Sequence, residues 1–153
     1  THTVLGYRMM EQERIDKRIK NAALMHHERF DGSGYPFGLK GERIDTFASI
    51  VSIADVYDAL TSDRCYRAAV CPFEVIAIFE SHGLTEYNPK FILTFLEHIA
   101  QTYIGNSVRL SDNRLGKISM IDTKNLLRPL IQLESGEFID LSKHLDLYVE
   151  EIV

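Results

Sequence analysis

The chain has 153 residues, 45% of them hydrophobic and 25% charged, which is ordinary for one globular domain with a single core and leaves room for a small appended subdomain. Its formal charge of -5, from 17 basic and 22 acidic residues, excludes a general basic surface for long nucleic acid, so a phosphate ligand must meet a local basic cluster. The sequence has neither an apolar run near the roughly 20 residues of a membrane helix nor an N-terminal signal segment, which predicts a cytoplasmic protein.

The first part of the chain carries helical patterns interrupted by a loop. Apolar residues recur at helical spacing in residues 4–13 and 15–28, which predicts one long helix or two shorter ones. Residues 31–41 contain four of the nine glycines, and we expect a loop there. We expect Thr46 to cap a helix that continues through Ser62. The apolar residues predicted to form its buried stripe are Ile50, Ile53, Ala54, Tyr57 and Leu60.

Two more helices and a change to β structure follow. Pro72 predicts a helix over residues 73–81 that Gly83 closes, and Asn88 with Pro89 predicts another over residues 90–102. Short apolar runs separated by turn sequences then predict strands at residues 108–110, 115–121, 130–133 and 138–141, and residues 147–153 end the chain as part of the same sheet. The predicted fold is mainly α, a helical domain over residues 1–104 with a small antiparallel β appendage over residues 105–153.

Two adjacent histidines, His26 and His27, come directly before the glycine-rich loop. Neighbouring side chains on a helix point about 100° apart, so the pair does not easily chelate one ion, but it could serve the two ions of a dinuclear centre. One buried and one solvated ring is the alternative. Asp55 favours the metal, because a carboxylate in an apolar helical stripe is costly unless it is paired or metal-bound. Nitrogen and carboxylate ligands together suit iron, manganese or zinc better than magnesium.

Basic and acidic residues after this helix are candidates for phosphate binding. Arg64 and Arg67 lie three residues apart, a spacing that on a helix puts two guanidinium groups on one face; a solvated basic turn is the alternative. Asp58 lies one helical turn beyond Asp55, where it could orient a ligand or a water, or pair with Arg64.

The loop and the cysteines complete the set of candidates. Tyr35 could stack on a guanine base, or it could pin the loop to the helices, and the two uses are compatible. Glu28 and Asp31 are expected at an ordinary helix C-terminus, with hydrogen bonding to the histidines as the alternative. Cys65 and Cys71 are expected to be free thiols, with a regulatory disulfide as the alternative.

Taken together, several of these motifs resemble those of the HD-GYP family, bacterial metal-dependent phosphohydrolases that linearise cyclic di-GMP. They are His26-His27, Gly34-Tyr35-Pro36, Asp55-Val56-Tyr57-Asp58 and Asp63-Arg64-Cys65-Tyr66-Arg67. The resemblance implies an HD-type helical bundle and a dinuclear or trinuclear centre of first-row metals, most readily iron or manganese. The metal ligands that it implies are His2, which Gly6 follows at the family spacing, His26, His27 and Asp55. The substrate-binding residues that it implies are Gly34, Tyr35, Pro36, Asp58, Arg64 and Arg67.

The function implied by the resemblance is hydrolysis of cyclic di-GMP to linear pGpG and then GMP in second-messenger signalling. The expected partners are a cyclic dinucleotide, a diguanylate cyclase or regulatory domain, and a second copy of the chain. A catalytically degenerate module that acts as a sensor or docking domain is an alternative from another class. A related hydrolase of a hybrid cyclic dinucleotide or a guanosine polyphosphate is a third reading, and the Gly34-Tyr35-Pro36 loop argues against the polyphosphate.

The family pattern is incomplete in these 153 residues. In the family, an acidic ligand, a further histidine and a His-Asp pair followed by a Lys precede the position of His2, and the sequence shows none of them. A complete dinuclear site needs about twice the four candidate ligands found here. We therefore expect the chain to be a piece of a longer enzyme, and the isolated chain to bind metal weakly and to hydrolyse little.

Overall fold

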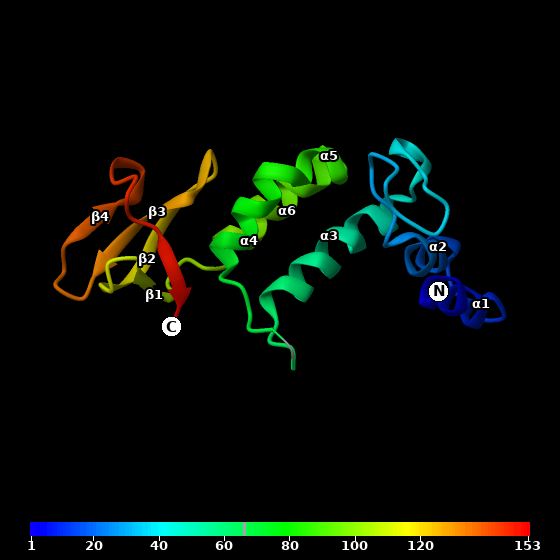
Figure 1. The fold of residues 1–153 in the computed structure, drawn as a ribbon, viewed down its shortest axis with the longest axis horizontal. Helices are drawn as coiled ribbons and strands as arrows, with labels where there is room; N and C mark the ends of the chain where they lie inside the picture. Colours follow the sequence, from blue (N-terminus) through cyan, green and yellow to red (C-terminus); the bar gives the residue numbers. More distant parts are fainter. Residues whose placement is uncertain (66) are drawn as a thin grey trace. The chain divides into compact units, whose positions relative to one another are not determined.

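The computed structural model describes residues 1–65 and 67–153, so Tyr66, which belongs to one of the family motifs, lies outside the described residues (Figure 1). The chain divides into two compact units, residues 1–60 with 79–93 and residues 61–78 with 94–153. This division follows contacts alone, and the predicted domain boundary after residue 104 stays a prediction. Among the described residues, no helix has the length and apolar character needed to cross a lipid bilayer.

The first unit begins with two helices that pack against each other, α1 (His2–Glu11) and α2 (Lys17–Met25), so the shorter-helix alternative is correct (Figure 1). Asp16 begins α2, because its carboxylate accepts a hydrogen bond from the backbone N–H of Arg18. The predicted loop follows α2 and leads into a short 3₁₀ helix, η1 (Gly41–Arg43). Gly32 and Gly38 have φ of 88° and 63°, the region that favours glycine.

Helix α3 (Thr46–Thr61) starts where the sequence predicts, but a different residue caps it. Asp45 Oδ1 accepts the backbone N–H of Phe47, so Asp45 and not Thr46 is the N-cap. The predicted buried stripe is also partly wrong: Ile53 and Tyr57 are buried, but Ile50 is 45% exposed. Ala54 is exposed too and Leu60 is half-buried. Apolar residues surround most of this helix, so its periodicity could not identify the buried face. The residues that are buried are Ala48, Ser49, Ser52, Ile53 and Tyr57.

The next helical stretch is longer than predicted. Helix α4 (Pro72–Ile78) begins at the predicted proline, but the chain continues through a π-helical turn, η2 (Phe79–Gly83), into α5 (Leu84–Glu86). Gly83 therefore does not end the helix. A Cβ at Gly83 would lie 2.5 Å from Cδ1 of the buried Ile92, so a larger residue would force the end of that side chain to shift. Helix α6 (Pro89–Gln101) follows close to its predicted bounds.

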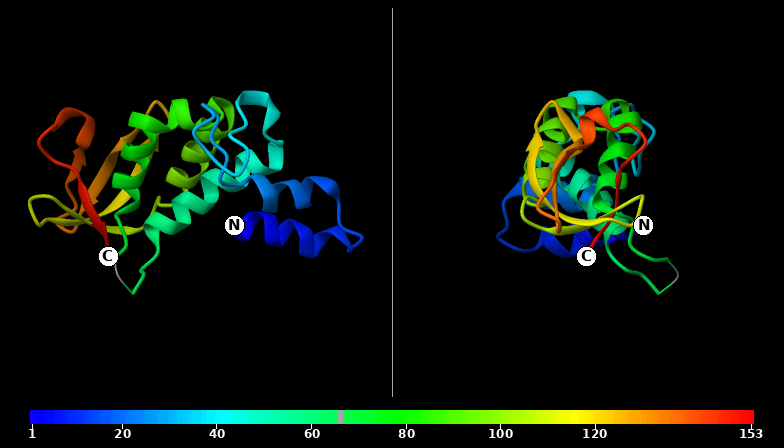
Figure 2. Two further views of the ribbon diagram at one scale, coloured as in Figure 1. Left: turned by 45° about the vertical axis from the view of Figure 1, so that its right-hand side comes forward. Right: turned by 90° about the vertical axis from the view of Figure 1, so that its left-hand side faces the viewer.

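The second unit contains a five-stranded antiparallel sheet in the order β4-β3-β2-β1-β5, larger than a small appendage (Figure 2). All five predicted strands are present. Their bounds are β1 (Ser107–Leu110), β2 (Leu115–Asp122), β3 (Asn125–Leu133), β4 (Phe138–Asp140) and β5 (Val149–Ile152), with a 3₁₀ helix, η3 (Leu141–Lys143), between the last two. Helix α4 contacts β3 and β5. The buried side chains of the sheet include Val108, Leu110, Ile118, Ile131, Ile139 and Val149.

Strand β3 begins before its predicted start at Leu130, because Pro129 does not interrupt it. The register between β2 and β3 shifts beside this proline, from Ile118 opposite Ile131 to Met120 opposite Leu130. Proline lacks an N–H and is tolerated inside sheets mainly at such irregularities. The strand therefore continues through a residue that usually marks a strand boundary.

Candidate metal centre

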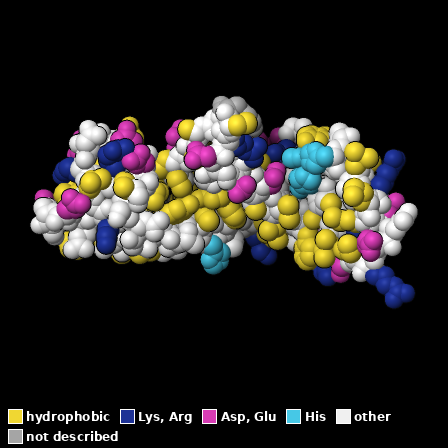
Figure 3. All heavy atoms as spheres, turned by 90° about the horizontal axis from the view of Figure 1, so that it is seen from below, with side chains coloured by type: hydrophobic (Ala, Val, Ile, Leu, Met, Phe, Trp, Pro, Cys, Tyr) yellow, Lys and Arg dark blue, Asp and Glu magenta, His cyan; other side chains and the backbone are white. Residues whose placement is uncertain are grey.

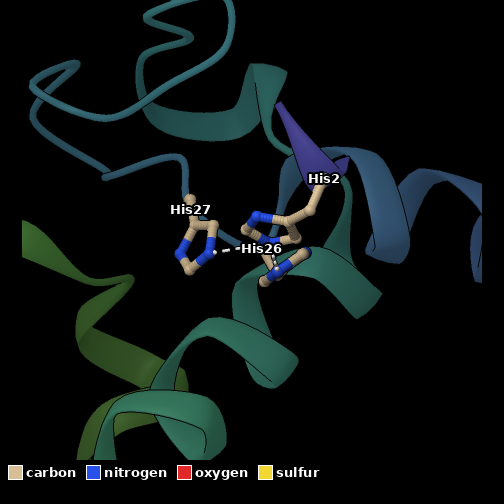
Figure 4. Close-up of side chains that lie close together, drawn as sticks. All are labelled: His2, His26 and His27. Carbon is tan, nitrogen blue, oxygen red and sulfur yellow. Dashed lines mark hydrogen bonds between the residues drawn. The ribbon is translucent and has the colours of Figure 1, made fainter. Parts of the chain in front are cut away.

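Three histidines meet in the first unit, and their rings point toward one another (Figure 4). His2 opens α1, whereas His26 and His27 follow directly after the last residue of α2. The Nε2 atom of His2 lies 3.2 Å from that of His26 and 3.1 Å from that of His27. One ring nitrogen from each of the three lies within 4.8 Å of the other two. The adjacent His26 and His27 therefore converge on one place with a third imidazole, which their helical spacing alone did not predict.

The ring of His26 is oriented by backbone carbonyls. Its Nδ1 lies 3.1 Å from the carbonyl oxygen of Ala22 and 2.9 Å from that of Ala23, the residues one turn earlier in α2. An Nδ1–H that donates to these carbonyls leaves the lone pair on Nε2, the atom that faces His2. This is the usual arrangement of a metal-binding histidine.

The surroundings of His27 shift its pKa in the direction that favours the neutral, metal-binding form of the ring. Burial lowers its pKa, and the neighbouring imidazoles of His26 and His2 lower it further, while Asp55 acts in the opposite direction. A neutral imidazole keeps a lone pair for a metal ion, and a protonated one has none.

Asp55 lies beside the cluster, but the reason given from the sequence is wrong. Its Oδ2 is 4.0 Å from Nδ1 of His27, the ring nitrogen that does not face His2. The side chain is 47% exposed, so the cost of burying a carboxylate does not apply to it. Its assignment as a metal ligand rests on the family resemblance and on its position next to His27.

The three imidazoles fit a first-row metal ion. Imidazole nitrogens bind such ions at about 2.0–2.1 Å, so cis ligands around one ion lie close to 3 Å apart, as Nε2 of His2 does from Nε2 of His26 and from Nε2 of His27. His26 and His27 are half-buried and His2 is exposed. A group of histidine side chains is visible on the face drawn in Figure 3. An ion could therefore reach the cluster from solvent and find ligands already assembled.

The glycine-rich loop lies against the end of α2. The ring of Tyr35 stacks on that of His27, with centroids 4.8 Å apart and 29° between the planes. The backbone N–H of Tyr35 donates to the carbonyl oxygen of His27 over 3.1 Å. At Gly34, a Cβ would lie 2.3 Å from the backbone nitrogen of Arg29, so only glycine fits. The peptide bond between Tyr35 and Pro36 is cis. Tyr35 thus holds the loop against His27, which is one of the two roles predicted for it. Its side chain is still 44% exposed, so part of the ring is open to solvent.

The remaining candidate residues lie on α3 and beyond it. Asp58 is exposed on α3, one turn after Asp55. Arg64 and Arg67 are not on a helix, because α3 ends at Thr61; each donates its backbone N–H to the other's carbonyl in an isolated antiparallel bridge. Residues directly opposite in such a pair project to the same face. The two arginines belong to the second unit, and their assignment to a substrate phosphate stays a prediction.

Glu28 is the residue of this region whose role the sequence did not indicate. It was expected at an ordinary helix C-terminus or in a hydrogen bond to the histidines, but its side chain is 2% exposed and both carboxylate oxygens accept backbone N–H groups of the loop. The signal that could have indicated this role is its position in the sequence, directly between the histidine pair and a glycine-rich loop whose backbone N–H groups need acceptors.

Comparison with known proteins identifies the family of the chain. The family model "HD domain" matches residues 1–91. The chain is 34% identical over 134 residues to the cyclic di-GMP phosphodiesterase PA4108 of Pseudomonas aeruginosa, covering 86% of the chain and 32% of that protein. It is 39% identical over 102 residues to the cyclic di-GMP phosphodiesterase response regulator RpfG of Xanthomonas campestris pv. campestris, covering 65% and 27%. It is 55% identical over 53 residues to the 3'3'-cGAMP-specific phosphodiesterase 1 of Vibrio cholerae, covering 35% and 12%.

The chain thus spans about a third or less of the length of these relatives. The family model covers more than half of the chain, and it includes the three converging histidines, the loop and Asp55. The chain belongs to the HD domain family, as its resemblance to the HD-GYP phosphohydrolases predicted.

Proposed function

We propose that this chain is part of a metal-dependent phosphodiesterase that hydrolyses cyclic di-GMP to linear pGpG and GMP. The convergence of the Nε2 atoms of His2, His26 and His27 carries the proposal, because it places three imidazole ligands where one ion can use them. The names of the relatives PA4108 and RpfG support the choice of substrate.

In this proposal the three histidines and Asp55 hold a first-row metal, iron or manganese, as part of a dinuclear or trinuclear centre. Such ions lower the pKa of a bound water and neutralise charge on a phosphoester. The residues of the chain do the rest. Asp58 orients a ligand or the attacking water, and Arg64 and Arg67 bind phosphate oxygens through their guanidinium forks. The Gly34-Tyr35-Pro36 loop lies at the guanine base, where the exposed part of Tyr35 can stack.

A hybrid cyclic dinucleotide is a second candidate substrate, favoured by the similarity to the cGAMP-specific phosphodiesterase of Vibrio cholerae. Both substrates contain at least one guanine, so the loop does not distinguish them. The predicted diguanylate cyclase contact, homodimer and cytoplasmic location stay predictions.

The test is hydrolysis of cyclic di-GMP and 3'3'-cGAMP by the full-length gene product and by the 153-residue chain, each with Mn²⁺ and Fe²⁺, with products separated by chromatography. We expect turnover by the full-length protein, loss of turnover in His27→Ala, and little turnover by the 153-residue chain. If 3'3'-cGAMP were cleaved faster than cyclic di-GMP, the hybrid cyclic dinucleotide would be the preferred substrate. A metal-free and inactive full-length protein would contradict the proposal and favour the sensor or docking module.

A further inference from the structure

Glu28 is a buried carboxylate with a specific task in the loop. Its Oε1 accepts the backbone N–H of Phe37 over 2.7 Å, and its Oε2 accepts that of Leu39 over 2.9 Å. The side chain is 2% exposed. A buried carboxylate is costly unless both oxygens are satisfied, and here two loop amides satisfy them. The Glu28 carboxylate therefore fixes the loop to the backbone directly after His27.

The loop has little freedom to move against the end of α2. Before the Glu28 contacts, Tyr35 donates its backbone N–H to His27, and Gly34 lies so close to the backbone of residues 27–29 that no Cβ fits. After them, the backbone N–H of Gly41 donates to the carbonyl oxygen of Phe30 over 2.9 Å. Glu28 holds the segment between these two attachments, directly after Tyr35 and Pro36. The position of the Tyr35 ring follows from all of these contacts together.

The Tyr35 ring in turn defines the plane of the His27 imidazole. Metal-binding histidines are usually oriented by a hydrogen bond on the second ring nitrogen, as His26 is by Ala22 and Ala23. For His27 the corresponding Nδ1 lies 4.0 Å from Asp55, longer than a hydrogen bond. Stacking on Tyr35 restricts the ring instead, so that Nε2 faces His2.

We propose that Glu28 is a positioning residue: by binding the amides of Phe37 and Leu39, it holds Tyr35 against His27 and orients that imidazole toward the metal. This proposal rests on the proposed metal-dependent function. It gives the Gly34-Tyr35-Pro36 loop a second role: besides stacking on a guanine base, the loop orients the metal-binding imidazole of His27. In this proposal Glu28 acts through Tyr35, because both of its carboxylate oxygens already accept amides of the loop.

The experiment follows the ring C–H resonances of His27 in the metal-free chain, which a stacked tyrosine moves upfield. Tyr35→Leu removes the stack and gives the reference shift. Glu28→Gln keeps the size of the side chain but replaces one acceptor oxygen by an NH₂ group, which cannot accept from an amide. We expect Glu28→Gln to move the His27 resonances downfield, toward their Tyr35→Leu positions. Glu42→Gln, an exposed glutamate just beyond the loop, is the matched control and should leave them unchanged.

The second readout is the apparent affinity for Mn²⁺, measured on the same samples. Residues that orient metal ligands change affinity by about 10–100-fold when replaced, so we expect weakening of that order in Glu28→Gln and Tyr35→Leu and none in Glu42→Gln. Tyr35→Leu leaves the buried carboxylate in place and keeps the test decisive if Glu28→Gln does not fold. Unchanged His27 resonances in a folded Glu28→Gln, or unchanged affinity in Tyr35→Leu, would overturn the proposal. Because the ring shift is read without metal, a wild-type chain that binds no Mn²⁺ would contradict the proposed function separately.

Discussion

The Nε2 atoms of His2 and His27 lie 3.1 Å apart although the residues are 25 positions apart in the chain. The packing of α1 against α2 brings them together, and His26 joins them from the position next to His27. The candidate metal site is therefore a property of a helix pair, and it depends on the loop that closes against the end of α2.

Replacing Gly34 by Ala should destabilise the first unit. The new Cβ would lie 2.3 Å from the backbone nitrogen of Arg29 and 2.5 Å from the carbonyl oxygen of His27, and backbone atoms cannot move aside as a flexible side chain does. We expect a loss of about 1–3 kcal/mol or more in the free energy of unfolding, measured by urea denaturation.

The control for this change is Gly6→Ala. Gly6 lies within α1, and no atom lies within 4 Å of the Cβ that alanine would add. Alanine is a better helix former than glycine by about 1 kcal/mol, so the variant should be unchanged or more stable. Equal destabilisation by both alanines would contradict the close approach at Gly34.

The cap of α3 gives a second stability prediction. Asp45→Ala removes the acceptor for the N–H of Phe47 and for the side-chain amide of Asn21, so it should lower the free energy of unfolding by about 0.5–2 kcal/mol. Thr46→Ala, one residue later, should change it by much less. The opposite ranking in thermal or urea unfolding would restore Thr46 as the cap.

The two cysteines should differ in reactivity. Burial raises the pKa of the Cys71 thiol, and the thiolate is the form that reacts with iodoacetamide. A raised pKa leaves less thiolate at any pH below it, so alkylation of half-buried Cys71 should be slower than that of exposed Cys65 at pH 8 and should approach it only as the pH rises. Mass spectrometry of the two peptides over a pH series measures this. Equal rates in the folded chain would show that Cys71 is not shielded, and equal rates in urea are the expected control.

Local signals in the sequence located most elements. These signals are the proline at the start of α4, the glycines at positive φ in the loop and the alternating apolar residues in β1 and β2. Each acts through the backbone of a few neighbouring residues, so it can be recognised from the sequence without knowing the fold. The errors occurred where packing decides. Gly83 packs against the end of the Ile92 side chain inside a continuing helical stretch, and Ile50 is exposed because α3 buries a different face.

The sequence itself pointed to His26 and His27, but the complete candidate site was predictable only through the resemblance to a family. His2 became a candidate because of the family spacing, since one histidine at the start of a helix predicts nothing by itself. Asp55 was chosen for a burial that it does not have. Glu28 was missed, because its partners are backbone amides of Phe37 and Leu39, and the sequence does not show which amides a loop turns inward.

Removing one imidazole should weaken the whole cluster. His26→Ala deletes the ligand whose Nδ1 is already held by backbone carbonyls, so its loss cannot be replaced by a small rotation of a neighbour. We expect the affinity for Mn²⁺ to fall at least about 10-fold. The exposed His98 on α6 offers the control His98→Ala, which should bind Mn²⁺ as the wild type does, and calorimetry or paramagnetic titration measures both.

The most direct test of the metal centre is a titration of the 153-residue chain with Mn²⁺, followed through the ring resonances of its six histidines. Paramagnetic broadening detects even weak binding and reports which rings lie close to the ion. The account predicts that the signals of His2, His26 and His27 broaden first and together, while those of His98 and His144 persist. Equal broadening of all six, or selective broadening that survives in His26→Ala, would contradict it.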